Sequence, residues 1–266
     1  MTNRNFIPDF VSLHRYFLKI SFDGTNYNGW QVQKNSSQTV QQKINEGLSQ
    51  LLNEKIEIFG CCRTDTGVHA KELYAHFDSE KILVGNKTKV HWIYKFNKMI
   101  PKDISIDEIC KVKEDASARF DATARTYQYF IHQKRNPFLL GHSYYYYGEL
   151  DLLLMNKASV LLKKYDDFTA FSKISTQAKS NICKIYKAEW KQKDDKLIFT
   201  IRANRFLRGM VRMITGTMIS LGKYKMTLDE FRKVIESKDC RNAGALAPAC
   251  GLFLTKVEYP KTIFKK

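Results

Sequence analysis

The chain has 266 residues, and its 44 Lys and Arg against 27 Asp and Glu give a formal net charge of +17. This basic excess attracts polyanions, and nucleic acid is the commonest partner of a basic globular protein. The sequence has no apolar run of about 18 residues and no signal-peptide pattern at its start, so we expect a soluble protein rather than one held at an anionic membrane surface.

Strand and helix patterns alternate in the first part of the chain. Apolar residues alternate with others over 16–22, which predicts a strand. Helical spacing of apolar residues follows over 40–52, and Thr39 with Gln42 three residues later has the pattern of a capping box at its start. The mainly apolar run 56–59 then predicts a strand that leads into a glycine-containing loop.

The second half repeats this mixture of patterns. Apolar residues alternate over 197–201, and we expect this strand to pair with the run around 182–192 through the turn 193–196. The aromatic run Tyr144–Tyr147 predicts a strand with two aromatic faces. A capping-box pattern, Thr227 with Glu230, precedes another helix.

A further helix is predicted over the arginine-rich segment that precedes residue 217. Three arginines are spaced as one face of it: Arg205, Arg208 and Arg212. Arg202 lies just ahead, on the incoming strand. Gly209 and Gly216 fall on the same helix, where each glycine costs about 1 kcal/mol relative to alanine, so we expect another backbone to approach closely there.

The mixture of elements in both halves predicts an α+β fold of two domains. Gly and Pro are sparse, so the domains are joined without a long flexible linker. A basic connection near residues 111–115 is the candidate boundary, which gives an N-terminal domain over 1–112 and a C-terminal domain over 113–266.

Cysteine and histidine spacing gives no sign of a disulfide framework or a metal site. The six cysteines show no C-x-x-C pattern, and the vicinal pair Cys61-Cys62 is poorly placed for a normal disulfide, which suits a reducing, cytoplasmic location. The six histidines form no H-E-x-x-H or other ligand pair, so scattered structural or surface histidines are the favoured interpretation. We expect no metal.

The loop GCCRTDTGVHA (60–70) contains Asp65-Thr66-Gly67, the tripeptide that carries the catalytic carboxylate of aspartic proteases. Those enzymes need two carboxylates that share one proton, and a nearby cation prevents the sharing. Here Arg63 precedes Asp65 by two residues, a spacing that puts both side chains on one face of an extended segment. The tripeptide occurs once, so we reject a protease.

Five separated segments, from about Arg15 to Tyr259, resemble the tRNA pseudouridine synthase A family. They read FDGTNYNGWQVQ (22–33), RTDTGVHA (63–70), ARFDATARTYQYFI (118–131), FLRGMVRMITG (206–216) and APACGLFL (247–254). Three departures from the family pattern remove no expected functional side chain. They are Cys62 in place of a usual Gly, Ser117 in place of a frequent His, and KELYAHF (71–77) without the common G-Q-V.

The resemblance implies a role for each matching residue. Asp65 is the catalytic carboxylate, and Arg212 pairs with it. Tyr127 stacks on the flipped base, and Leu252 forms an apolar wall under the uracil. Arg63 enters the RNA stem and helps to extrude the target nucleotide.

Plainer interpretations stay open for several positions. Tyr127 has the pattern of an ordinary sheet aromatic, which is the interpretation we favour for Tyr129. Leu252 would look the same as a core strand leucine. Three further arginines are phosphate candidates or members of a solvated basic face: Arg202, Arg205 and Arg208.

The chemistry of the implied reaction agrees with these residues. Conversion of uridine to pseudouridine breaks the N1–C1′ bond and rejoins the sugar to C5 of the same base, so no redox change occurs and no cofactor is needed. The reaction needs one ionised carboxylate beside the sugar, acting as a nucleophile or as a base toward the C2′ proton.

The resemblance implies a tRNA pseudouridine synthase that modifies positions 38–40 of the anticodon arm and works as a homodimer. Each domain would contribute a mostly antiparallel sheet flanked by helices, with a basic RNA-binding cleft between the domains. The alternative is a non-catalytic RNA-binding or tRNA-chaperone protein on the same scaffold. A synthase acting on other RNA uridines is a more distant alternative.

Overall fold

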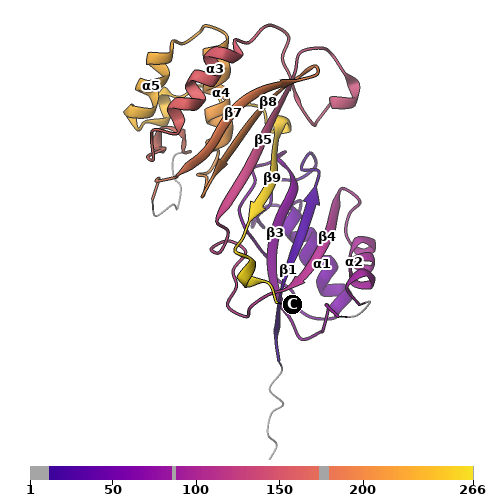
Figure 1. Ribbon diagram of the computed structural model, residues 1–266. Coiled ribbons are helices and arrows are strands. Elements are labelled where there is room, and N and C mark those ends of the chain that lie inside the picture. Colours follow the sequence, from indigo (N-terminus) through magenta and orange to yellow (C-terminus); the bar gives the residue numbers. More distant parts are fainter. Residues whose placement is uncertain (1–11, 86–87, 174–179, 266) are drawn as a thin grey trace, which may run out of the picture.

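One sheet runs through the whole molecule. The computed structural model describes residues 12–85, 88–173 and 180–265. Its sheet has the strand order β4-β1-β3-β9-β5-β8-β7, with β2 beside β3 and β6 beside β5 (Figure 1). Most pairings are antiparallel, and the exceptions are the parallel pairs β3–β9 and β5–β6. The mixed, mainly antiparallel architecture confirms the α+β prediction.

The N-terminal half builds one end of the sheet. Its strands are β1 (His14–Phe22), β2 (Phe59–Gly60), β3 (His69–Ser79) and β4 (Ile104–Lys111), and its helices are α1 (Val40–Leu52) and α2 (Thr88–Met99). The predicted strand and helix are confirmed: β1 buries Tyr16, Leu18 and Ile20, and α1 begins where the Thr39 side chain accepts a hydrogen bond from the Gln42 N–H.

The C-terminal half builds the other end. Its strands are β5 (Ala124–His132), β6 (Tyr144–Tyr145), β7 (Ile185–Lys193), β8 (Lys196–Ala203) and β9 (Leu252–Glu258), and its helices are α3 (Leu152–Leu162), α4 (Met210–Gly222) and α5 (Leu228–Ser237). The β7–β8 hairpin is confirmed, with Lys193 opposite Lys196. Thr227 and Glu230 form the expected reciprocal capping box.

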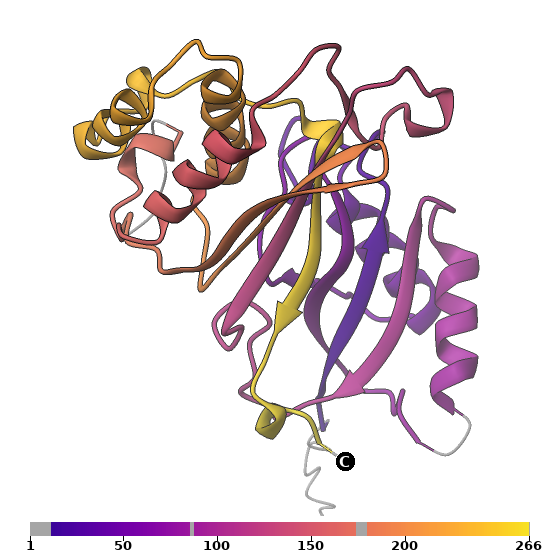
Figure 2. The same ribbon diagram turned by 45° about the horizontal axis from the view of Figure 1, so that its top comes forward.

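The strand β9 joins the two halves. It pairs antiparallel with β5 along one edge and parallel with β3 along the other, where His69 lies opposite Phe253 and Ala70 opposite Leu254. The helices fall into two groups at opposite ends of this sheet, α3, α4 and α5 beside β7 and β8, and α1 and α2 beside β1 and β4 (Figure 2). The two halves therefore share one continuous sheet.

Two strand predictions were too long. The run 56–59 contributes only Phe59 to β2, because Ile56 and Ile58 are buried with irregular backbone whose N–H groups bond to the side chains of Ser49 and Asn45. The tyrosine run forms only the two-residue strand β6, since the chain leaves β5 after Tyr145.

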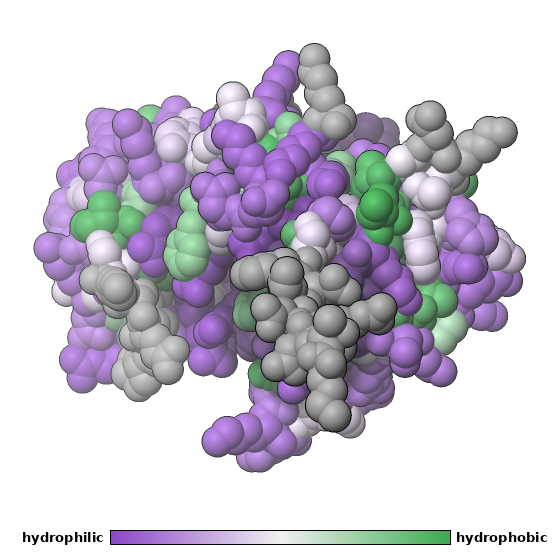
Figure 3. Space-filling model, turned by 90° about the horizontal axis from the view of Figure 1, so that it is seen from below, coloured by the Kyte–Doolittle hydropathy of each residue, from purple (hydrophilic) through white to green (hydrophobic). Residues whose placement is uncertain are grey.

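The molecule presents a largely polar exterior. Seen from below, hydrophilic residues cover most of the visible surface, and hydrophobic residues form separate patches among them (Figure 3). Among the residues that the structure describes, no helix combines the length and the apolar character needed to cross a membrane.

Gly216 shows why glycine is required in the middle of α4. A Cβ atom added there would lie 1.8 Å from the carbonyl oxygen of Ala245, so the backbone of the segment before β9 packs directly on the helix. The expected close approach is confirmed at this position. Gly209 differs, because it is the N-cap of α4 with a φ of 73°, a left-handed conformation that favours glycine.

We expect Gly216→Ala to lower the free energy of unfolding by about 2 kcal/mol, because overpacking against backbone outweighs the gain in helix propensity of about 1 kcal/mol. Urea unfolding followed by circular dichroism measures the change. Gly85→Ala is the matched control, since among the described residues its added Cβ meets only the Thr88 hydroxyl, at 3.3 Å. Equal stability of the two variants would contradict this packing argument.

Candidate active site

The loop that carries Asp65 lies against the segment after β1. The Trp30 N–H donates to the Thr64 carbonyl at 3.2 Å, and the Gly67 N–H donates to the Tyr27 carbonyl at 3.3 Å. Gly67 has a φ of +74°, which turns the chain just after Asp65. Backbone hydrogen bonds thus fix the loop on both sides of the carboxylate.

Asp65 meets Arg212 across the two halves of the chain. Arg212 Nη1 lies 3.3 Å from Asp65 Oδ2, and the two side chains are only 15% and 18% exposed. Arg212 Nε also donates to the Ala247 carbonyl at 2.8 Å, and the Ala247 N–H donates back to the Arg212 carbonyl. The guanidinium is therefore held in place by the segment before β9 while it faces the carboxylate.

Two of the predicted helix-face arginines lie outside the helix. Because α4 begins at Met210, Arg205 and Arg208 belong to the preceding loop, so the expected arginine face of three residues is wrong. Arg208 is exposed and Arg205 is half-buried, and neither forms an ion pair with another described residue. The left-handed turn at Gly209 is what separates them from the helix that carries Arg212.

Arg202 is used within the protein. Its Nε and Nη2 atoms each lie 2.8 Å from an oxygen of Glu258, and its guanidinium lies over the Tyr186 ring, 4.8 Å from the centroid. The hydrogen bond from Arg202 lowers the pKa of the Glu258 carboxyl. The pair connects β8 with the end of β9.

Arg63 and Asp65 differ in exposure. The Arg63 side chain is exposed, whereas the Asp65 side chain is only 18% exposed and turns to Arg212. Within the described residues, Arg63 forms no ion pair with Asp65. Its position beside the loop leaves the guanidinium free to contact a ligand.

Tyr127 lies on β5, near the start of the Asp65 loop. Its hydroxyl donates to Cys62 Sγ at 3.6 Å, and its ring meets the Phe206 ring edge-on with centroids 5.1 Å apart. The side chain is 6% exposed, and this burial raises the pKa of Tyr127. Its register opposite Leu254 places its side chain on the same sheet face as Leu252.

Leu252 is the first residue of β9 and is 5% exposed. It lies opposite Tyr129, whose hydroxyl donates to the Pro248 carbonyl at 2.8 Å. Leu252 therefore forms part of the wall between the segment before β9 and the aromatic face of β5, and Tyr129 has the structural role favoured from the sequence.

The vicinal cysteines form a thiol pair that the sequence could not interpret. The Cys61 thiol donates to Cys62 Sγ at 3.8 Å, and this hydrogen bond, together with that of Tyr127, lowers the pKa of Cys62. Burial raises the pKa of Cys61. The departure from the usual glycine at position 62 was the signal, because the added side chain reaches Tyr127.

Arg125 is a buried cation, not a surface one. It is 7% exposed, and its two Nη atoms donate to four backbone carbonyls at 2.7–3.0 Å, those of Cys61, Arg119, Ala122 and Asn204. The Arg125 guanidinium is therefore occupied within the protein. Its guanidinium instead ties the beginning of the Asp65 loop to β5.

Comparison with known proteins gives consistent similarities. Residues 163–260 match a family model described as tRNA pseudouridine synthase. The chain is 48% identical over 257 residues to tRNA pseudouridine synthase A of Bacteroides thetaiotaomicron, covering 96% of this chain and 94% of that protein. The corresponding protein of Bacteroides fragilis is 46% identical, covering 96% of this chain and 100% of that protein. That of Clostridium acetobutylicum is 37% identical, with 91% and 98% covered.

Removal of the Arg125 guanidinium should destabilise the fold. We expect Arg125→Met to lower the free energy of unfolding by about 3 kcal/mol or more, because each buried carbonyl that loses its donor costs about 1–3 kcal/mol. Arg202→Met is the matched control, with an expected loss of about 1 kcal/mol or less, since its ion pair is partly exposed. Denaturant unfolding of both variants measures these two decreases in the free energy of unfolding. A smaller decrease for Arg125→Met than for Arg202→Met would contradict the prediction.

Proposed function

The chain belongs to the tRNA pseudouridine synthase A family, and we propose that Asp65 performs its chemistry, assisted by Arg212 and Tyr127. The enzyme is an isomerase that converts uridine in tRNA into pseudouridine. The observation that carries the assignment of Asp65 is its contact with Arg212 at 3.3 Å, which brings together two family motifs far apart in the sequence. A solvated turn aspartate would have no such partner.

Asp65 supplies the carboxylate that the isomerisation requires. It attacks C1′ as a nucleophile, or it removes the C2′ proton as a base, and in either route the N1–C1′ bond breaks and uracil leaves with its bonding electrons. The uracil then turns and C5 bonds to C1′. In the nucleophilic route C5 displaces Asp65 from C1′, and in the base route Asp65 returns its proton to C2′ as C5 bonds to C1′. Loss of the C5 proton and protonation of N1 complete the exchange, so Asp65 is regenerated and no group is added from outside.

Arg212 prepares the carboxylate for this role. Its Nη1 faces Asp65, while Nε is held by the Ala247 carbonyl, so the positive charge is positioned before the substrate arrives. The positive charge stabilises a carboxylate in a site that is largely closed to water.

Tyr127 and Leu252 confine the uracil while it is detached. Tyr127 presents an aromatic ring beside Cys62, three residues before Asp65, and base stacking on such a ring is worth about 1–3 kcal/mol. Leu252 shares the sheet face of Tyr127 and adds apolar surface. A base held between these side chains stays close enough to C1′ to react a second time.

Three arginines contact the RNA: Arg63, Arg205 and Arg208. Arg63 enters the stem next to the extruded nucleotide, and Arg205 and Arg208 contact phosphates, since none of the three is used in an ion pair among the described residues. Arg202 contacts a phosphate only through Nη1, because Glu258 occupies Nε and Nη2. The net charge of +17 supports binding through the RNA backbone.

The proposal also covers the modified positions, the RNA-binding cleft, the oligomeric state and the cellular location. The substrate uridines are those at positions 38–40 of the tRNA anticodon arm, which bind in a basic cleft between an N-terminal domain over 1–112 and a C-terminal domain over 113–266. The enzyme acts as a homodimer in the cytoplasm. Support comes from the family membership and from a catalytic pair whose members belong to different halves of the chain.

Mapping of pseudouridine in cellular tRNA tests both the activity and its positions. In cells that lack the gene, we expect pseudouridine to disappear from positions 38–40, to return with the wild-type protein, and not to return with Asp65→Asn. The amide keeps the side-chain shape but can act neither as nucleophile nor as base. Filter binding should show tRNA affinity of the variant within a few-fold of wild type, because affinity comes from distributed phosphate contacts.

Each outcome separates one alternative. Full modification by Asp65→Asn would exclude Asp65 as the catalytic carboxylate. Unchanged pseudouridine in the absence of the gene would support the non-catalytic RNA-binding alternative. Loss of pseudouridine at positions other than 38–40 would support the synthase activity but contradict the proposed positions. Asp194→Asn, in the exposed β7–β8 turn, is the matched control and should restore modification in full.

The stacking role of Tyr127 predicts different behaviour of two substitutions. Tyr127→Phe keeps the π face, so we expect single-turnover rates within a few-fold of wild type, whereas Tyr127→Leu should be slower by roughly tenfold or more. Saturating tRNA removes the effect of binding, and Tyr129→Phe controls for loss of a buried tyrosine hydroxyl on the same strand. Equal impairment by Phe and Leu would show that the hydroxyl, not the ring face, matters.

A further inference from the structure

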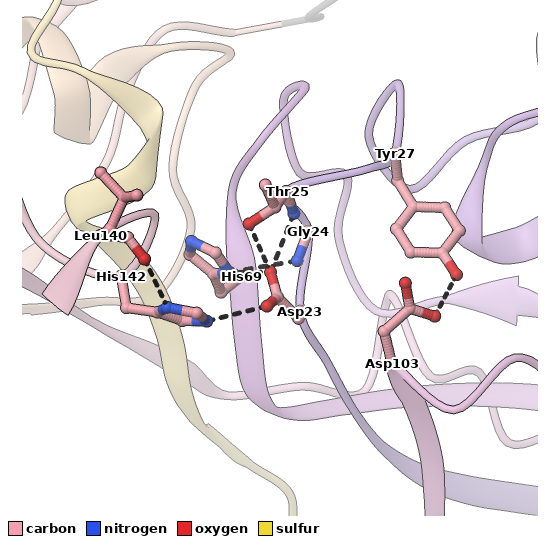
Figure 4. Close-up of polar contacts among 8 residues, drawn as sticks. All are labelled: Asp23, Gly24, Thr25, Tyr27, His69, Asp103, Leu140 and His142. Carbon is pink, nitrogen blue, oxygen red and sulfur yellow. Dashed lines mark hydrogen bonds and ion pairs between the residues drawn. The ribbon is translucent and has the colours of Figure 1, made fainter. Parts of the chain in front are cut away.

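Asp23, His69 and His142 converge on one point beside the Asp65 loop. Asp23 follows β1, His69 begins β3, and His142 comes from the segment between β5 and β6, so the three reach this point from distant parts of the chain (Figure 4). One ligand atom from each residue lies within 4.8 Å of the other two. Histidine nitrogens and a carboxylate oxygen in such a set are the donors of Zn²⁺ sites.

Backbone hydrogen bonds fix the tautomer of each imidazole. His142 Nδ1 lies 3.0 Å from the Leu140 carbonyl, an acceptor, so Nδ1 carries a proton, and in the neutral imidazole Nε2 keeps its lone pair. The Gly24 N–H donates to His69 Nδ1 at 3.1 Å, so this nitrogen keeps its lone pair as well. Both lone-pair nitrogens face the same carboxylate (Figure 4).

The resulting arrangement is electron-rich. His142 Nε2 lies 2.8 Å from Asp23 Oδ2, and His69 Nδ1 lies 3.0 Å from Asp23 Oδ1. In the neutral tautomers, both contacts bring two lone pairs together, and a cation bound between them makes them favourable.

We propose that Asp23, His69 and His142 bind one divalent transition-metal ion of borderline softness, of which Zn²⁺ is the representative. Bonds of about 2.0–2.1 Å in tetrahedral geometry place ligand atoms about 3.3 Å apart. The two contacts with Asp23, at 2.8 and 3.0 Å, are a few tenths of an ångström shorter, and all three ligand atoms lie within 4.8 Å of one another. Side-chain adjustments that place these atoms around one ion complete the site, at the cost of the Gly24 hydrogen bond to His69.

The surroundings of the three ligands are those of a metal site. The Leu140 carbonyl at His142 Nδ1 is the usual partner of a metal-bound histidine, and the Thr25 N–H and hydroxyl hold Asp23 Oδ1 at 3.0 and 2.6 Å. A cavity of about 440 Å³ opens beside the three side chains and provides an entry path and room for a water ligand. Lys71 shares this cavity, but its ammonium lies over the Phe130 and Phe253 rings.

Sequence spacing gave no sign of this site, because its two histidines become neighbours only in the fold. The ion has a structural role, since it connects His142, before β6, with His69 at the start of β3 and Asp23 after β1. It does not depend on the chemistry proposed for Asp65, so failure of one proposal leaves the other standing.

Metal titration of the full-length, untagged protein tests the proposal. After removal of metal with a chelator, Co²⁺ should bind at one equivalent with the strong ligand-field absorption of tetrahedral coordination, and Zn²⁺ should displace it. His142→Ala, which removes a half-exposed ligand, should weaken binding by more than about 100-fold. His91→Ala, on α2, is the matched control and should bind as the wild type does.

Thermal unfolding gives a second readout. Zn²⁺ should raise the melting temperature of the wild type and of His91→Ala but not of His142→Ala, because an ion that binds only the folded state stabilises it. The absence of saturable Co²⁺ absorption in the wild type would overturn the proposal. A signal that persists unchanged in His142→Ala would also overturn it, since it would show that the ion binds elsewhere in the protein.

Discussion

The insertion of β9 between β3 and β5 is the constraint on which the rest of the structure depends. Parallel pairing at His69–Phe253 and Ala70–Leu254 fixes the end of the Asp65 loop to the segment that holds Arg212. The distance between carboxylate and guanidinium is therefore set by the sheet, not by the two flexible side chains alone. Arg125 also fixes the position of the Asp65 loop, because its guanidinium donates a hydrogen bond to the carbonyl of Cys61 at the start of the loop.

Local patterns were enough to predict β1, α1, the β7–β8 hairpin and the cap of α5, since each depends on residues close in sequence. The errors occurred where distant contacts decide the backbone. Residues 56–59 have strand composition, yet two of their backbone N–H groups donate hydrogen bonds to side chains of α1 instead of to a neighbouring strand. The arginine helix was extended too far toward the N-terminus because the φ of 73° at Gly209 cannot be read from periodicity.

Motifs located the candidate site, but they did not reveal how its parts support each other. Asp65 and Arg212 could be paired by resemblance, and the structure places them in contact. Nothing in the sequence separates Arg125 from the arginines near the surface, because burial and four carbonyl partners are properties of the fold. The same limit applies to His69 and His142, which a linear search treats as isolated residues.

The position of β9 also has a consequence for the order in which the protein can mature. Of the described strands, β9 is synthesised last, although it occupies the centre of the sheet. A nascent chain that stops before it leaves the inner edges of β3 and β5 exposed, and unpaired edges are templates for aggregation. Formation of β9 closes both edges at once, so a chain that lacks this strand presents two unpaired edges in the middle of its sheet.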